Sequence, residues 1–225
     1  MSENNQYLWD NHISERIKTL VQHIPYQAHI ADIGCDHGFL VYEAFKEHRI
    51  EFALAVDNKI GPLTSAFVHL PPSHQIVYSL SSGLTDVDNH IDTIIIAGMG
   101  GHLIGDLLKE FPEKIKGKKI ILSPQHKASE CRRVFNELNI KIINEEIYEF
   151  DHQIYTIIDA WGDSEVSHYS ELEIEFGPIF LKTKPQLWVQ QLVKEKQRLE
   201  AIPHLEEHPV ELKRLNLILL ALKKE

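Results

Sequence analysis

Hydrophobic positions fall into two patterns that alternate along the chain. Short runs such as AHIADI, FALAVD and DTIIIA are apolar at nearly every position, which indicates strands buried on both faces. QIVYSL and KKIILSP are further expected strands. Between the strands, apolar side chains recur at helical spacing over residues 12–24, 38–48, 60–69, 101–110 and 127–139. This alternation predicts an α/β fold whose parallel sheet is covered by helices on both faces.

The last two expected strands break the alternation. KIINEEIYEF and QIYTIIDAWG meet at a short turn, DHQ, which predicts an antiparallel hairpin. A parallel sheet that ends in such a hairpin is typical of Rossmann-like methyltransferases, whereas dinucleotide-binding domains usually end with one more parallel strand.

Beyond Gly162 the chain becomes acidic and polar and is interrupted by prolines, and two helical stretches follow over residues 186–202 and 207–224. Their apolar positions suit a helical hairpin and comprise Leu192, Leu199, Leu212, Leu215, Ile218 and Leu222. We therefore predict two domains, residues 1–162 and residues 163–225, of which the second is helical and coiled-coil-like.

The composition is that of a globular protein, with 43% hydrophobic and 25% charged residues in a chain of 225. No apolar run approaches the roughly 20 residues of a membrane-spanning helix. Because the first residues also contain no apolar signal core, we expect a cytoplasmic protein that does not enter a membrane. Cys35 and Cys131 are too few for a disulfide framework, and the fourteen histidines lack metal-ligand spacing, so no metal site is expected.

The net charge of −10 argues against indiscriminate binding to nucleic acid, but the charge is unevenly distributed. Residues 109–141 contain nine Lys and Arg against four acidic residues, and residues 182–225 contain nine against six. A polyanionic partner therefore remains possible if it contacts these two segments.

The first expected strand runs into the sequence HIADIGCDHGFL, in which Asp32, Gly34, Asp36 and Gly38 form the pattern D-x-G-x-D-x-G. A pyrophosphate needs backbone N–H groups and no anion at the start of the following helix. Asp36 lies where that anion would be, so a cofactor with a positive centre and no phosphate, such as S-adenosylmethionine (SAM), fits better. The simpler alternative is that Asp36 only caps the helix.

Three further segments at strand ends would meet this loop at the carboxyl edge of the sheet, where ligands bind in open α/β folds. Asp57 ends the second strand and could accept hydrogen bonds from the ribose hydroxyls of either NAD or SAM. Small residues follow the third and fourth strands, in SSG and IIIAGMGG, and leave room for a ligand. The predicted cofactor-binding residues are Asp32, Gly34, Cys35, Asp36, Gly38, Asp57, Asn58, Ser82, Gly83, Ala97, Gly98, Met99 and Gly100.

The fifth strand leads into Ser123, Pro124 and Gln125 at the same edge. The hydroxyl and the amide could read the edge of a base, and the proline could form a wall of its pocket. Many enzymes that methylate base nitrogens carry an Asn/Asp-Pro-Pro-aromatic loop after the preceding strand, and this chain has none.

Taken together, these segments resemble the bacterial tRNA adenine-22 N1-methyltransferases, the TrmK family. ADIGCDHGFL is similar to the family's A-D-I-G-S-D-H-x-x-L, and IAGMGG matches its I-A-G-M-G-G unchanged. SERIKTLVQHIP resembles its S-x-R-L helix, with Arg16 at the family's arginine, and GPIFL matches its G-P-x-L. LSPQH matches L-Q-P-N loosely, with Ser123 and Gln125 at the departures, and Ser82 replaces an acidic residue.

The resemblance implies a class I SAM-dependent methyltransferase domain with a helical C-terminal domain, acting on N1 of an adenine in the D-arm of tRNA. The residues expected near the reacting base are Asp36, His37, Ser123, Pro124 and Gln125. The residues expected to contact tRNA phosphates are Arg16, Lys116, Lys118, Lys127 and Arg132. We expect a monomer.

Three alternatives remain open at this stage. An NAD(P)-binding oxidoreductase would have to accommodate Asp36 beside its pyrophosphate. A methyltransferase of the same fold could act on another substrate, and an RNA-binding or assembly protein could retain the fold without catalysis.

Overall fold

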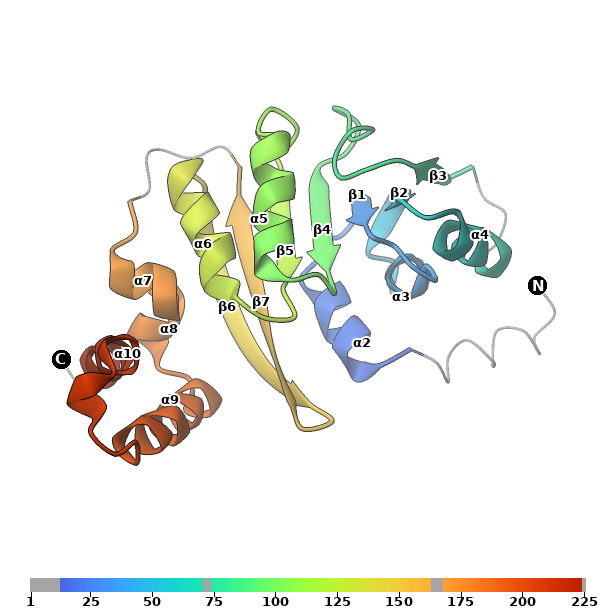
Figure 1. The fold of residues 1–225 in the computed structure, drawn as a ribbon. Coiled ribbons are helices and arrows are strands. Elements are labelled where there is room, and N and C mark those ends of the chain that lie inside the picture. The colour runs from blue at the N-terminus through green and yellow to red at the C-terminus, as the bar shows by residue number, and fades with distance from the viewer. Residues whose placement is uncertain (1–12, 71–73, 163–167, 224–225) are drawn as a thin grey trace.

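A computed structural model describes residues 13–70, 74–162 and 168–223 of the chain. One seven-stranded sheet forms its centre, with the strand order β3-β2-β1-β4-β5-β7-β6 (Figure 1). The strands are β1 (Ala28–Ile33), β2 (Ile50–Asp57), β3 (Ile76–Leu80), β4 (Thr93–Ala97), β5 (Lys119–Ser123), β6 (Lys141–Phe150) and β7 (Gln153–Trp161). β1 to β5 are parallel, and β7 pairs antiparallel with β5 and with β6. The predicted terminal hairpin is therefore confirmed.

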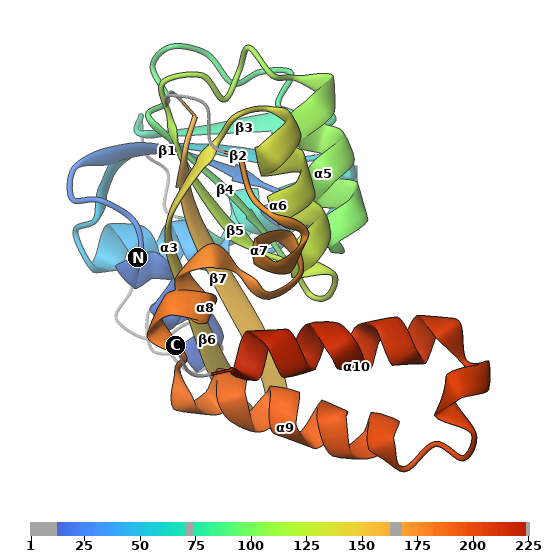
Figure 2. The ribbon, with the colours of Figure 1, turned by 90° about the vertical axis from the view of Figure 1, so that its left-hand side faces the viewer.

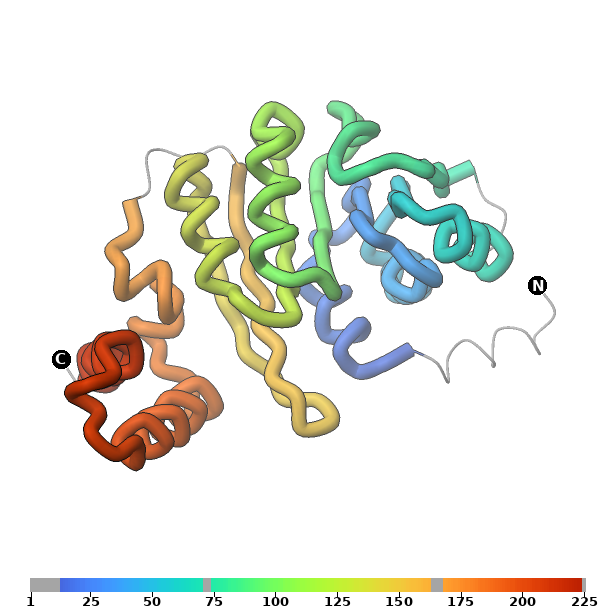
Figure 3. The backbone as a smooth tube through the Cα atoms, viewed as in Figure 1, coloured from blue at the N-terminus to red at the C-terminus, as the bar shows by residue number. Residues whose placement is uncertain are grey.

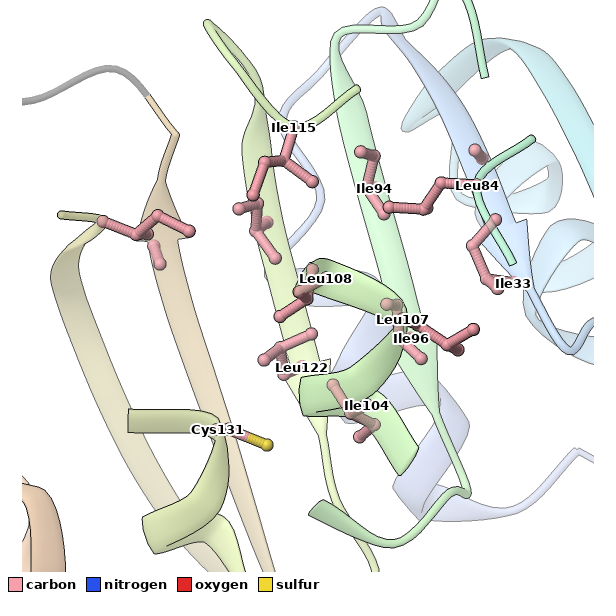
Figure 4. Close-up of a cluster of buried hydrophobic side chains, with 14 of the residues drawn as sticks. Ile33, Leu84, Ile94, Ile96, Ile104, Leu107, Leu108, Ile115, Leu122 and Cys131 are labelled. Atoms are coloured by element: carbon pink, nitrogen blue, oxygen red, sulfur yellow. The ribbon is translucent and has the colours of Figure 1, made fainter. Parts of the chain in front are cut away.

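Helices cover both faces of the sheet, as the buried strands require. In the sheet region they are α2 (Glu15–Gln22), α3 (Phe39–Lys46), α4 (Ile60–His69), α5 (Gly101–Glu110) and α6 (Ala128–Glu137). The apolar faces of α2, α3 and α4 pack on one side of the sheet, and those of α5 and α6 on the other. Figure 4 shows Ile104 and Leu108 of α5 directed toward Leu122 of β5 within the second of these cores.

The strand order reverses between β1 and β4, because the chain proceeds outward from β1 through β2 to β3 and then crosses back to β4. The connections that leave β1 and β4 consequently diverge to opposite faces of the sheet. Such a switch point leaves a crevice at the carboxyl ends of the two strands, which is where ligands bind in this class of fold.

The C-terminal region is helical and has a hydrophobic cluster of its own. It consists of α7 (Glu171–Phe176), α8 (Pro178–Thr183), α9 (Gln186–Glu200), a 3-10 turn (Leu205–Glu207) and α10 (Pro209–Leu222). Figure 2 shows α9 and α10 side by side, which is the helical hairpin expected from the sequence. Pro178 and Pro209 begin helices rather than break them, because the first turn of a helix does not use its N–H groups. A break was expected at Pro178, so α8 was not predicted, and neither was α7, which Ser170 caps.

A buried ion pair joins the C-terminal helices to the sheet. Arg132 of α6 and Glu145 of β6 are each 3% exposed, and Arg132 Nε donates to Glu145 Oε1 at 2.6 Å. The guanidinium also donates to the carbonyls of Ile174 and Glu175 at the end of α7, both at 3.3 Å. The prediction that Arg132 contacts a tRNA phosphate is therefore wrong, since its donors are enclosed by protein acceptors.

The GPIFL segment completes this junction. Gly177 has φ of +95°, and a Cβ atom there would lie 2.5 Å from Glu145 Oε2. The same oxygen accepts the backbone N–H of Ile179 at 3.0 Å. A side chain at position 177 would thus be strained and would also displace the carboxylate that Arg132 binds.

Candidate active site

The carboxyl ends of the parallel strands β1 to β5 surround a cavity of about 620 Å³ at the switch point. Most of the predicted cofactor and catalytic residues line it, namely Asp32, Gly34, Cys35, Asp36, His37, Asp57, Asn58, Ser82, Gly83, Ala97, Gly98, Met99 and Gln125. Residues at the ends of five strands, β1 to β5, therefore meet in one place although they lie far apart in the sequence.

The loop after β1 follows the backbone of β2 closely. The N–H groups of Gly34 and Cys35 both donate to the carbonyl of Val56, at 2.8 and 2.9 Å. Gly34 has φ of +80°, and a Cβ atom there would collide with the Met99 side chain. The backbone conformation therefore favours glycine, and a larger residue would also displace the end of the Met99 side chain.

Two predicted glycines lie behind the cavity and do not line it. Gly38 begins α3, and a Cβ atom there would lie 2.9 Å from the Leu70 side chain. Gly100 precedes α5, and a Cβ atom there would lie 2.9 Å from His126 Nε2. Gly38 allows α3 to approach the end of α4 closely, and Gly100 leaves room for the His126 side chain of the loop after β5, so both contribute to a ligand site indirectly.

Three aspartates give the cavity its charge. Asp57 accepts the backbone N–H of Asp36 at 3.3 Å on Oδ2 and that of Lys59 at 2.9 Å on Oδ1. Asp36 takes a left-handed conformation, with φ of +49°, and its side chain is 66% exposed. The N-cap of α3 is Gly38 and no side chain caps this helix, so the helix-cap interpretation of Asp36 is wrong.

The third aspartate, Asp32, is buried at the end of β1. Its Oδ2 has no hydrogen-bond partner among the described residues. Burial, followed by the nearby charges of Asp57 and Asp36, raises the pKa of Asp32 to about 7. A cationic group placed in the cavity would supply the partner that this carboxyl lacks.

The side chain of His37 contacts Ser65 of α4 and lies beside that of Asp36. Its Nδ1 lies 2.7 Å from Ser65 Oγ, and its Nε2 lies 3.6 Å from Asp36 Oδ1. The imidazole is therefore positioned at the rim of the cavity by a hydroxyl of a separate helix.

Only one residue of the SPQ segment reaches the cavity. Ser123 is 2% exposed at the end of β5, and Pro124 is also buried. Gln125 is exposed, and its backbone N–H donates to the carbonyl of Met99 at 2.9 Å. Ser123 and Pro124 thus support the loop from behind and are not placed to contact a base.

The predicted phosphate contacts separate into two groups. Ser14 caps α2 and places Arg16 in its first turn, at the rim of the cavity, and Lys127 is exposed in the loop after β5 at the same edge of the sheet. Lys116 lies in the loop before β5, at the opposite edge. Lys118 is 6% exposed, and burial lowers the pKa of its ammonium group, which donates to the carbonyls of Asp88 and Ile91. Its prediction as a phosphate contact is wrong.

Some of the residues that line the cavity were not predicted from the sequence. Ile17 and Leu20 of α2 and Leu103 and Leu107 of α5 also line the cavity, from helices on opposite faces of the sheet. The helical spacing of these residues indicated an apolar face, but their own segments contain no signal that this face borders a ligand. In the parts of the chain that the structure describes, no group of His, Cys, Asp and Glu could hold a metal ion, and no helix could span a membrane.

Comparison with known proteins agrees with this geometry. The family described as "Methyltransferase domain" matches residues 13–158. The tRNA (adenine(22)-N(1))-methyltransferase of Bacillus subtilis (strain 168) is 30% identical over an alignment of 199 residues, and the match covers 84% of each chain. The chain belongs to the tRNA (adenine(22)-N(1))-methyltransferase family.

Solved structures extend the likeness to the whole fold. The Streptococcus pneumoniae protein Sp1610, in complex with S-adenosyl-L-methionine, is 28% identical with a TM-score of 0.84, over 94% of this chain and 100% of that chain. The M. capricolum TrmK structure, in complex with S-adenosyl-homocysteine, is 28% identical with a TM-score of 0.81, over 93% and 97%. The similarity of this family member to both includes the C-terminal helices, because nearly the entire chain is aligned.

Proposed function

We propose that this protein transfers the methyl group of SAM to N1 of adenine 22 in tRNA. The observation that carries the proposal is the acidic cavity at the switch point, formed by Asp32, Asp36 and Asp57 in a chain of this family. The named activity of the Bacillus subtilis relative supports the base and the position.

The cavity residues fit SAM, which has a sulfonium, an ammonium group and no phosphate. The unpartnered oxygen of Asp32 and the exposed carboxylate of Asp36 suit the positive groups. Asp57 can accept hydrogen bonds from ribose hydroxyls, because a carboxylate oxygen that accepts one backbone N–H keeps further acceptor capacity. Ser82 and Gly83 line the part of the cavity that remains for the adenine of the cofactor.

The residues of this chain would mainly hold and align the reactants. When bound, SAM supplies an electrophilic methyl group. N1 of a neutral adenine already has a lone pair in the plane of the ring, so no general base is needed and alignment is the principal contribution. The methylated ring is cationic, and we assign its stabilisation to Asp36 and Gln125, with His37 beside them. Since N1 lies on the Watson–Crick edge, the base must leave its pair.

We infer that Arg16 and Lys127 contact tRNA phosphates, because both lie at the edge of the sheet where the base would enter. The proposed C-terminal domain, residues 163–225, would provide a second contact through the basic segment 182–225. We further infer that the protein acts as a monomer in the cytoplasm.

Incubation of the purified protein with methyl-labelled SAM and bulk tRNA tests the proposed function. Label is expected in the tRNA fraction, and none is expected in a DNA duplex supplied in place of the tRNA. An excess of unlabelled SAM should dilute the label, whereas the same excess of NAD should not. Retention of tRNA without incorporation of label would instead support an RNA-binding protein that lacks catalysis.

The affinity for SAM is expected to depend on pH through Asp32. Below pH 7 this carboxyl is protonated and neutral, because its pKa is raised to about 7. Binding of a cation favours loss of that proton, so affinity should rise roughly tenfold from pH 6 to pH 8 and then level off. Calorimetric titration at several pH values measures this.

The control for this pH dependence is Asp32→Asn, whose SAM affinity should be nearly independent of pH over the same range. The other ionisable residues that line the cavity are Arg16, Cys35, Asp36, His37, Asp57 and Lys59, of which Asp57 and Asp36 act on Asp32. If the SAM affinity of Asp32→Asn depended on pH as strongly as that of the wild type, a group other than Asp32 would be responsible, which would contradict the role given to Asp32.

A further inference from the structure

A second cavity, of about 500 Å³, adjoins the first and is lined by Arg16, Gln125, Gln153, Ile154 and Tyr155. Arg16 and Gln125 line both cavities, so the two meet at these side chains. The part contributed by β7 lies near the end of the terminal hairpin, which extends past the other strands beside α2 (Figure 3).

The two cavities differ in charge. Three aspartates line the first, against the two cations Arg16 and Lys59, whereas none of the described residues that line the second is acidic and Arg16 is its cation. A cationic cofactor therefore suits the first cavity, and part of a polyanion suits the second. A base that enters the second cavity lies next to a methyl donor in the first.

The wall on the hairpin is aromatic. The guanidinium carbon of Arg16 lies 5.2 Å from the ring centroid of Tyr155, so this ring presents a face toward α2 that already accommodates a planar group. The hydroxyl of Tyr155 donates to Gln153 Oε1 at 2.8 Å, which leaves the amide NH2 of Gln153 available. Exposed nucleobases are bound by such combinations of an aromatic face and side-chain amides.

We propose that Tyr155 is the stacking platform for the target adenine, with Gln153 and Gln125 at the edge of the base and Arg16 displaced toward the tRNA backbone. This inference rests on the proposed function and adds the position of the substrate base to it. It places the reacting nucleotide against the hairpin of the sheet and not against the helical C-terminal region.

A set of matched variants tests the platform. Tyr155→Leu removes the ring and keeps an apolar side chain, and Tyr155→Phe keeps the ring and removes the hydroxyl. Tyr148 is the cross-strand partner of Tyr155 but does not line the cavity, so Tyr148→Leu removes a comparable aromatic contact of the hairpin. The measurements are the SAM dissociation constant and the single-turnover rate of tRNA methylation at saturating SAM.

Tyr155→Leu is expected to lower the methylation rate by about 10- to 100-fold while SAM affinity stays within about twofold of wild type. Tyr155→Phe and Tyr148→Leu should stay within about threefold. A wild-type rate for Tyr155→Leu would overturn the proposal, and so would an equal loss in Tyr155→Phe and Tyr155→Leu. If the wild-type protein methylates adenine 22 and these variants contradict the expectation, only the platform fails and the proposed function stands.

A measurement on the unmodified protein covers the case in which Tyr155→Leu does not fold. A tRNA transcript with 8-azidoadenosine at position 22 is irradiated in complex with the wild-type protein, and the adduct is assigned by fragmentation of the digested chain. An adduct within residues 153–155 is expected. Adducts confined to the C-terminal helices, or to other parts of the chain outside this range, would overturn the proposal.

Discussion

Arg132→Ala is expected to reduce the free energy of unfolding by about 3–5 kcal/mol, because it leaves the buried Glu145 carboxylate without its partner. In the native protein Arg132 binds that carboxylate and two carbonyls at the end of α7. Its removal therefore also breaks the two hydrogen bonds that α6 donates to the end of α7. Chemical denaturation measures the change in stability.

Arg133→Ala is the matched control for this prediction. Arg133 is the neighbouring residue of the same helix, but its side chain is 46% exposed and its contact with Glu130 is 3.7 Å long. An exposed pair of this kind contributes about 0–1 kcal/mol. If Arg132→Ala were as stable as Arg133→Ala and lost tRNA binding instead, Arg132 would be a phosphate contact after all.

Asp57→Ala is expected to weaken SAM binding by at least about 100-fold. The carboxylate would accept charge-assisted hydrogen bonds from the ribose, and removal of such an acceptor costs about 1.5–3 kcal/mol for each bond. It also holds the loop after β1 through the N–H group of Asp36 and accepts the N–H of Lys59 in its own turn. Isothermal titration with SAM, together with the melting temperature of the variant, measures the effect.

Two further variants calibrate this result. Asp57→Asn keeps one acceptor oxygen and should lose about tenfold in affinity. Asp106 lies on the exposed face of α5, outside the cavity, so Asp106→Ala should bind SAM as the wild type does. A folded Asp57→Ala protein with nearly wild-type affinity would exclude the ribose contact.

The cofactor half of the site could be predicted because each of its parts is encoded locally. Asp32, Gly34 and Asp57 lie at the ends of apolar runs, and the carboxyl ends of parallel strands necessarily meet at one edge of a sheet. The charge conflict at Asp36 was also visible from the sequence, and the structure removes the competing explanation, since Gly38 is the residue that precedes α3.

The nucleic-acid half was harder to predict because charge alone does not reveal burial. Lys118 belongs to a basic run that looks exposed, yet its ammonium group binds the carbonyls of a loop more than 20 residues earlier in the chain. Arg132 lies beside the apolar stripe of its helix, and its partner Glu145 is supplied by a strand of the hairpin. In the sequence Tyr155 is an ordinary strand residue, because only the folded chain brings Arg16 of α2 over its ring.

The most direct test of the central claim compares two tRNA transcripts that differ only at position 22, one with adenine and one with guanine. Each is incubated with the protein and SAM and then copied by reverse transcriptase, which a methyl group on N1 of adenine blocks. A stop adjacent to position 22 is predicted in the adenine transcript only, and only when SAM is present. No stop in either transcript, or the same SAM-dependent stop in both, would contradict methylation of adenine 22 by this protein.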